Sequence, residues 1–165
     1  MENLSTSAGV SFRLNIIEMI CYEKKARWAC WEAAMFFNFQ VKTNRQTELI
    51  DITRRVQELI RKTGVTEGVC YVFVPHTTAA ITINENADPS VPRDLLMTIN
   101  QMVPFQGPYQ HLEGNSPAHI KASLFGCSLA ILIDRGDLVL GTWQGIFFCE
   151  FDGPRDRKVY VKVME

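Results

Sequence analysis

The stretch VPHTTAAITINENAD, residues 74–88, is the segment around which the rest of the chain is organised. Two apolar, strand-like runs end in polar residues: 70–74 leads to His76, Thr77 and Thr78, and 79–83 leads to Asn84, Glu85, Asn86 and Asp88. A rigid apolar scaffold that presents polar side chains in this way is typical of a functional site. A polar hairpin rim with turn-forming Asn and Asp explains the stretch as well, so both interpretations stay open here.

Length and composition indicate one soluble domain. The chain has 165 residues, of which 47% are hydrophobic and 21% charged, and such a chain buries about two thirds of its unfolded surface. The net charge of -1 gives no excess of basic residues, so no nucleic-acid partner is predicted. Every apolar run is broken before the roughly 18 residues that a membrane span needs, so no membrane association is predicted.

The cysteines favour a reducing compartment. There are five, namely Cys21, Cys30, Cys70, Cys127 and Cys149, and no two form a CxxC pair. An odd, scattered count without a secretory signal predicts a cytoplasmic location. The last three lie inside apolar runs and are predicted to be buried thiols.

Residues 35–165 predict an α+β domain, a mostly antiparallel or mixed β-sandwich with about eight strands and three helices, because the strands do not alternate regularly with helices. Strands are predicted over 36–43, 48–52, 68–74, 79–83, 128–133, 138–140, 146–151 and 157–164. Helices are predicted from an N-cap at Thr53 to Lys62, from a cap at Ser90 to Pro104, and over 118–124.

Residues 1–34 differ from the rest and are predicted to be an atypical N-terminal extension, with the functional domain starting at Met35. The segment lacks the apolar core and small-residue cleavage site of a signal peptide. Loose apolar spacing from Ile16 to Ala34 predicts a helix in part of it.

The three histidines His76, His111 and His119 are the first candidates for chemistry. Three neutral imidazoles that converge on one point bind zinc or a similar ion and leave a position for water or substrate. Their spacing is not a local metal signature, so an ordinary hydrogen-bonding role for each histidine stays open.

Carboxylates and one arginine form a second group of candidates. Acid–base or metal-binding roles suit Glu85, Asp88, Glu113, Glu150 and Asp152, although acids near turns are often only solvated. Glu150 lies within an apolar run, so it faces solvent by alternation or enters a site. Arg155 follows Gly153 and Pro154 in a turn, where a fixed guanidinium suits phosphate or carboxylate recognition. The chain contains no Gly-rich phosphate loop and no nucleophile elbow.

Three motifs together carry a family resemblance: HTTAAITINENAD at 76–88, HLEGNSPAHI at 111–120 and LGTWQGIFFCEFDGPRDR at 140–157. The chain closely resembles the YjbQ-like family, whose members are often called secondary thiamine-phosphate synthases. The resemblance covers about Phe37 to the C-terminus and leaves out residues 1–34.

The resemblance implies a compact α+β sandwich that assembles as a homotrimer, with a divalent metal, zinc or magnesium, or an anion in one cleft. The implied metal ligands are His76, His111 and His119, and the implied catalytic residues are Glu85, Asp88 and Arg155. The implied substrate-binding residues are Thr77, Thr78, Asn84, Asn115, Trp143, Gln144, Glu150 and Asp152.

The reaction associated with the family joins a pyrimidine diphosphate to a thiazole phosphate and releases pyrophosphate. A divalent ion and cationic groups would stabilise the leaving diphosphate. Two alternatives stay open: a metal-dependent hydrolase of a small phosphorylated metabolite with Glu85 as general base, and a non-catalytic trimer that binds such a metabolite.

Overall fold

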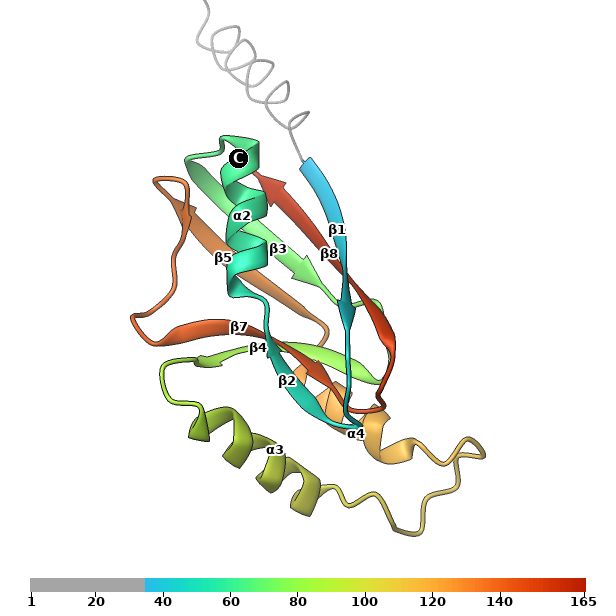
Figure 1. Ribbon diagram of the computed structural model, residues 1–165. Coiled ribbons are helices and arrows are strands. Elements are labelled where there is room, and N and C mark those ends of the chain that lie inside the picture. The colour runs from blue at the N-terminus through green and yellow to red at the C-terminus, as the bar shows by residue number, and fades with distance from the viewer. Residues whose placement is uncertain (1–34) are drawn as a thin grey trace, which may run out of the picture. The chain divides into compact units, whose positions relative to one another are not determined.

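The computed structural model describes residues 35–165, and the helix predicted within 1–34 lies outside them. The described part contains two antiparallel sheets and three helices (Figure 1). The larger sheet has the order β1 (Met35–Lys42), β8 (Asp156–Met164), β3 (Glu67–Phe73), β5 (Ser128–Asp134) and β6 (Asp137–Leu138). The smaller has the order β2 (Glu48–Asp51), β7 (Gln144–Glu150) and β4 (Ala79–Glu85). The helices are α2 (Thr53–Thr63), α3 (Ser90–Met102) and α4 (Ser116–Phe125). The predicted α+β class, with its eight strands and three helices, is confirmed.

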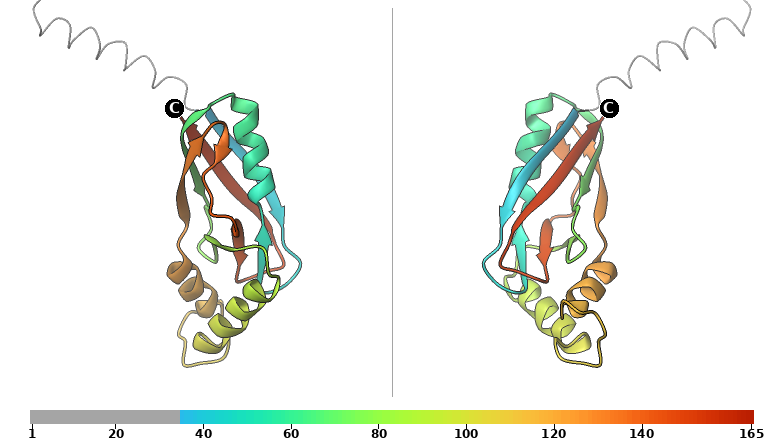
Figure 2. Two further views of the ribbon diagram at one scale, coloured as in Figure 1. Left: turned by 90° about the vertical axis from the view of Figure 1, so that its left-hand side faces the viewer. Right: turned by 90° about the vertical axis from the view of Figure 1, so that its right-hand side faces the viewer.

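Apolar side chains on two sides of the smaller sheet explain how the layers stack. One core lies between the sheets, where Val161 of β8 and Phe148 of β7 pack with Val56 of α2. The second core packs the opposite side of β7, at Phe147 and Cys149, against α3 and α4. Figure 2 shows these two helices at the end of the molecule away from α2. Because β7 is covered on both sides, six of its seven residues are buried, as in strands that lie between two layers.

Lys121 of α4 is buried in the helical layer. Its side chain is 0% exposed, Nζ donates to Asn100 Oδ1 of α3 at 2.6 Å, and it lies 3.7 Å from the centre of the Phe105 ring. Within residues 35–165 it forms no ion pair, and burial lowers the pKa of Lys121 to about 8. The ammonium therefore links α3, α4 and the loop between them. Removing this charge from water costs free energy.

The outward face of the larger sheet carries apolar side chains, with the exposed Lys162 of β8 in register between Phe36 and Tyr71. Alternation along the strands places Phe36, Tyr71 and Leu132 on that face, and all three are exposed. Tyr160 stacks on Phe36 with 5.2 Å between the ring centres and 23° between the planes. These four residues are called the aromatic patch below. The helices contact the smaller sheet or pack between the sheets, so no helix among the described residues covers the patch.

Three local predictions need correction. The residue before α2 is Ile52 rather than Thr53, and the Thr53 hydroxyl instead accepts a hydrogen bond from Ile146 N–H at 2.8 Å. Ser90 does not cap α3 with its side chain. Cys127 is exposed rather than buried, whereas Cys70 and Cys149 are buried as predicted. Cys127 follows Gly126 in the short link between α4 and β5, where the side chain faces outward.

No helix between residues 35 and 165 combines the length and the apolar character that crossing a membrane requires.

Candidate functional site

The polar residues that follow β3 line a cavity of about 290 Å³ together with residues from the β7–β8 turn and the start of α4. The short segment after β3 and the turn after β7 meet because Phe151 N–H donates to Thr78 O at 3.2 Å. Ten residues line the cavity: Pro75, His76, Thr77, Thr78, Glu113, Asn115, His119, Asp152, Arg155 and Arg157. The structure thus brings together eight of the predicted site residues: His76, Thr77, Thr78, Glu113, Asn115, His119, Asp152 and Arg155.

Behind the cavity lies a buried ion pair between Glu150 and Arg157, whose side chains are 0% and 7% exposed. Arg157 binds the carboxylate in a bidentate manner, from Nε to Oε2 at 2.7 Å and from Nη2 to Oε1 at 2.6 Å. Glu150 also accepts from the Thr43 hydroxyl and from the backbone N–H groups of Phe151 and Asp152. A buried carboxylate with this many donors is fully compensated, and it fixes the start of the turn that shapes the cavity.

Arg155 is held at the cavity mouth by its own turn. Its Nε donates to Asp152 O at 2.8 Å and its Nη2 to Asp152 Oδ2 at 2.7 Å. The Thr43 hydroxyl accepts from Arg155 N–H at 2.8 Å. A Cβ at Gly153 would collide with the carbonyl oxygen of Arg45, so the turn needs glycine there. These contacts fix the guanidinium although half of its side chain is exposed.

Asn115 connects the turn to α4. Its Nδ2 donates to Asp152 Oδ2 at 3.1 Å, while its Oδ1 is buried and accepts no hydrogen bond from residues 35–165. A buried acceptor without a partner is costly and rare. Asn115 therefore lines the cavity with a buried acceptor that no group within residues 35–165 satisfies.

His76 is the half-buried imidazole of the cavity. Its Nε2 accepts from Lys158 N–H at 2.8 Å, which places the ring proton on Nδ1. Burial and the nearby Arg157 charge lower the pKa of His76, so the ring is neutral at pH 7. Chemically, the site offers arginine N–H donors and the neutral imidazole of His76, which can exchange protons.

The histidines are only partly gathered. His119 of α4 lines the cavity with His76, while His111 lies with His119 in a neighbouring hollow of about 510 Å³. The rings of His111 and His119 are 5.3 Å apart and nearly perpendicular. Among residues 35–165 no three His, Cys, Asp or Glu side chains are arranged to hold one metal ion. This geometry does not fit a three-histidine zinc site, so the divalent ion stays a prediction of the sequence.

Five other predicted site residues lie at the far end of the smaller sheet: Asn84, Glu85, Asp88, Trp143 and Gln144. Glu85 pairs with Gln144 at the opposite end of β4 from Ala79, and seven strand residues span roughly 20 Å. The Asp88 carboxylate accepts Ser90 N–H at the start of α3 at 2.8 Å, and this bond lowers the pKa of Asp88. Within one chain, these residues do not reach the cavity.

Comparison with known proteins places this geometry in a family. A family model described as UPF0047 protein YjbQ-like matches residues 37–165. The chain belongs to the YjbQ-like UPF0047 family. The UPF0047 protein YugU of Bacillus subtilis is 49% identical over 131 residues, which cover 79% of this chain and 99% of YugU. The UPF0047 protein MJ1081 of Methanocaldococcus jannaschii is 54% identical over 130 residues, which cover 79% and 94%.

Solved YjbQ-like structures share the fold. An uncharacterised YjbQ/UPF0047 protein from Clostridium acetobutylicum superposes with a TM-score of 0.76 at 55% identity and covers 78% of this chain and 99% of its own. A YbjQ-like protein of unknown function from Sulfolobus solfataricus P2 gives a TM-score of 0.77 at 37% identity, with 80% and 98% covered.

The predicted thiamine-phosphate synthase activity is wrong as an inference from YjbQ-like membership. The relatives in Bacillus and Methanocaldococcus carry only the UPF0047 designation, and the Sulfolobus structure is described as of unknown function. Membership in the family therefore gives no support for joining a pyrimidine diphosphate to a thiazole phosphate.

Sequence reasoning missed Arg157 and Thr43, which build this YjbQ-like site from behind. Arg157 is in phase with Val159, Val161 and Val163 on β8, whose side chains face the core. A basic residue at an inward position signals a buried charge that needs a partner. The continuous apolar run around Glu150 carries a similar signal, because such runs are typical of strands covered on both sides.

Proposed function

We propose that the chain binds a small phosphorylated metabolite in the cavity lined by Arg155 and Arg157. The observation that carries this proposal is that both guanidiniums line one cavity of about 290 Å³ with donors left over. Hydrogen bonds within residues 35–165 involve Nε and Nη2 of each arginine. An arginine has five N–H donors, and the Nη1 group of each makes none of these bonds.

The carboxylate oxygens near Arg155 and Arg157 differ in how many of their hydrogen bonds are made within the protein. Glu150 is fully buried behind the cavity and its oxygens accept five hydrogen bonds. Asp152 Oδ2 accepts from both Asn115 and Arg155. The Glu150 oxygens and Asp152 Oδ2 thus serve the protein itself, whereas Asp152 Oδ1 and the exposed Glu113 carboxylate are acceptors beside the arginine donors.

The rigid turn supports selective recognition. Two guanidiniums held by short charge-assisted bonds lose little side-chain entropy when they bind an anion. No metal ion takes part in this proposal, because His76, His111 and His119 do not converge on one point. A cytoplasmic location belongs to this proposal, since the free thiols of Cys70, Cys127 and Cys149 suit a reducing compartment.

Replacing Arg155 tests the binding site directly. Arg155→Gln removes the charge and the Nη1 donors, and a charge-assisted hydrogen bond contributes about 2 kcal/mol, so we expect phosphate affinity to fall at least about tenfold. Isothermal titration calorimetry with inorganic phosphate measures this. Arg61→Gln is the matched control, because Arg61 pairs with Asp137 on the surface and does not line the cavity. Equal affinity of wild type and Arg155→Gln would contradict the proposal.

We also propose that the chain forms a homotrimer through the aromatic patch. Exposed aromatic and aliphatic side chains on a sheet face are typical of an interface with another chain. Phe36 and Leu132 are each 62% exposed, and burying both would contribute several kcal/mol per subunit.

Glutamate substitutions in the aromatic patch should break this assembly. We expect the double variant Tyr71→Glu/Leu132→Glu to shift the mass of the particle from a trimer to a monomer, because it places carboxylates in an apolar contact. Light scattering at micromolar concentration measures the mass. Met97→Glu is the control, since Met97 is an exposed apolar residue on α3 rather than on the sheet. A wild-type chain that is monomeric would rule the trimer out.

A further inference from the structure

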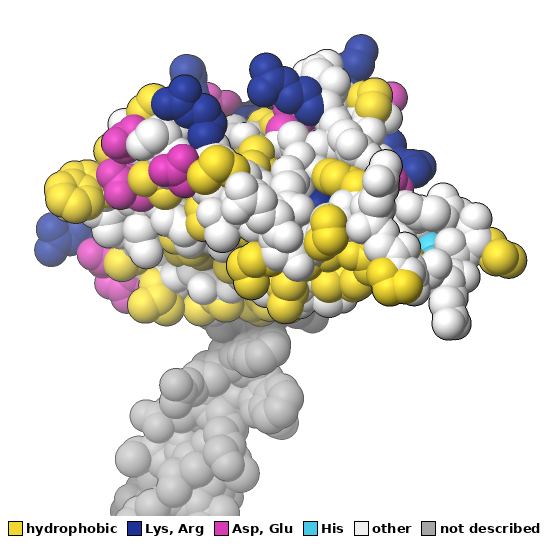
Figure 3. Space-filling view, turned by 90° about the horizontal axis from the view of Figure 1, so that it is seen from below, with side chains coloured by type: hydrophobic (Ala, Val, Ile, Leu, Met, Phe, Trp, Pro, Cys, Tyr) yellow, Lys and Arg dark blue, Asp and Glu magenta, His cyan; other side chains and the backbone are white. Residues whose placement is uncertain are grey.

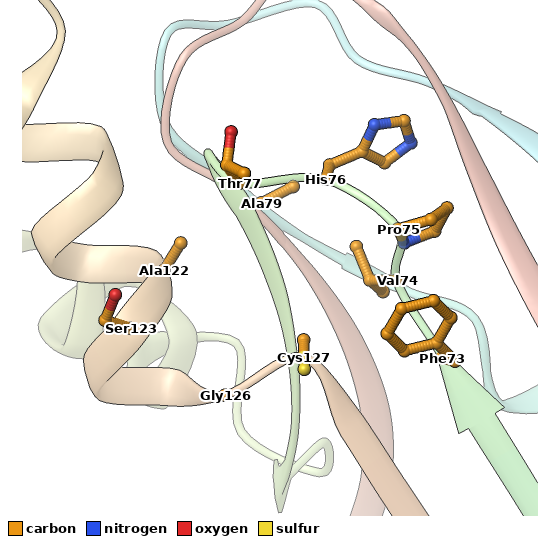
Figure 4. A pocket seen from close by; sticks show the side chains of 10 residues that line it. All are labelled: Phe73, Val74, Pro75, His76, Thr77, Ala79, Ala122, Ser123, Gly126 and Cys127. Atoms are coloured by element: carbon orange, nitrogen blue, oxygen red, sulfur yellow. The ribbon is translucent and has the colours of Figure 1, made fainter.

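The cavity adjoins a larger hollow of different chemistry, which we call the groove (Figure 4). The groove has a volume of about 650 Å³ and lies between the segment after β3 and the second half of α4. It is lined by Phe73, Val74, Pro75, His76, Thr77, Ala79, Ala122, Ser123, Gly126 and Cys127. None of these is an Asp, Glu, Lys or Arg residue, whereas the cavity has four such residues, Glu113, Asp152, Arg155 and Arg157.

The two hollows meet at one segment. Pro75, His76 and Thr77 line both the groove and the cavity. Because burial lowers the pKa of His76, the imidazole at the junction is neutral at pH 7 and leaves the groove without a formal charge. Val74, Ala79 and Ala122 are buried residues of the groove, while Phe73 and Cys127 are exposed.

We infer that the ligand is an organic phosphate whose compact apolar group lies in the groove while its phosphate lies between Arg155 and Arg157. This inference rests on the proposed function and adds the chemical class of the ligand. Ligand sites are commonly apolar hollows with a few convergent polar groups at one end. The uncharged groove would hold the apolar group and the arginine-lined cavity the phosphate, with residues 75–77 lining both.

The hydrophobic side chains at the helical end of the molecule do not compete with this assignment. Figure 3 views that end and shows hydrophobic side chains exposed across it. The exposed large hydrophobic residues of α3, α4 and the segment between them are Met97, Met102, Leu112, Ile120 and Leu124. Of these, Ile120 lines the hollow at His111, and none of the five lines the groove or the cavity. The groove shares three lining residues with the cavity, Pro75, His76 and Thr77, whereas the hollow at His111 shares only His119 with the cavity.

The test compares inorganic phosphate with phenyl phosphate on the full-length chain. Six carbon atoms placed in an apolar groove should tighten binding about tenfold, measured by calorimetry as the ratio of the two Kd values. Cys127→Gln puts a polar amide in the groove and should bring this ratio close to one. Leu124→Gln, at an exposed position of α4 outside the groove, should keep the wild-type ratio.

Alkylation of Cys127 by iodoacetamide locates the phenyl group independently. Peptide mass spectrometry follows this one thiol, and we expect saturating phenyl phosphate to slow its alkylation at least about fivefold, whereas inorganic phosphate should not. Phenyl phosphate that binds no tighter than phosphate, or that leaves Cys127 unprotected, overturns the inference while the phosphate site stands. A chain that binds neither compound overturns the proposed function and the inference with it.

Discussion

Glu150→Ala should lower the free energy of unfolding by about 3–5 kcal/mol, because it leaves the buried Arg157 guanidinium without its carboxylate. It also removes the acceptor of the backbone N–H groups of Phe151 and Asp152. Urea denaturation at one protein concentration measures the loss. Since that carboxylate fixes the turn, phosphate affinity should fall even under conditions in which the variant stays folded.

Two further variants sharpen this prediction. Asp137→Ala breaks the exposed pair with Arg61 and should cost less than about 1 kcal/mol. The double variant Glu150→Ala/Arg157→Met removes both charges and should recover part of the loss. A cost for Glu150→Ala no larger than that of Asp137→Ala would show that the buried pair does not stabilise the fold.

The second large effect is a dependence of stability on pH that comes from Lys121. Its pKa is about 8 in the folded chain against an ordinary value of 10.5. Between these values the unfolded chain binds more protons, so this group makes the folded chain more stable as pH rises through that window. From about pH 7.5 to about pH 9.5 the gain is about 2 kcal/mol.

The comparison of wild type with Lys121→Met isolates this contribution, because other groups titrate in both proteins. We expect the unfolding free energy of wild type to rise by about 2 kcal/mol relative to the variant over that pH range. Lys42→Met, at an exposed position of β1, is the control and should show no such change. A difference between wild type and Lys121→Met that is constant with pH would mean that Lys121 keeps its ordinary pKa.

Most of the secondary structure follows from local signals in the sequence. Alternation over 157–164 predicted β8, and Gly64 stops α2 because its φ of 75° suits glycine. The site was predictable where the cavity residues follow one strand end, as His76, Thr77 and Thr78 do. Asp152 and Arg155 were candidates from their chemistry and their place at a turn, whereas Asn115 was reached through the motifs of the family resemblance.

The motif at 76–88 shows that residues close in sequence can lie far apart in the fold. His76 and Glu85 are near neighbours in sequence, yet β4 carries Glu85 to the other end of the smaller sheet, beside Gln144. An extended strand rises about 3.3 Å per residue, so a motif that contains a whole strand cannot form one compact site in one chain.

The sequence by itself determined the α+β sandwich, its elements and the family, because these depend on periodicity, turn residues and motifs along the chain. Tertiary structure alone decided that Glu150 is buried, that Arg157 neutralises it, and that His111 lies outside the cavity. The physical reason is that burial of β7 on both sides depends on α2, α3, α4 and the larger sheet together. A charged residue in that strand is tolerated only when a partner of opposite charge across the β7–β8 turn offsets the cost of burying it.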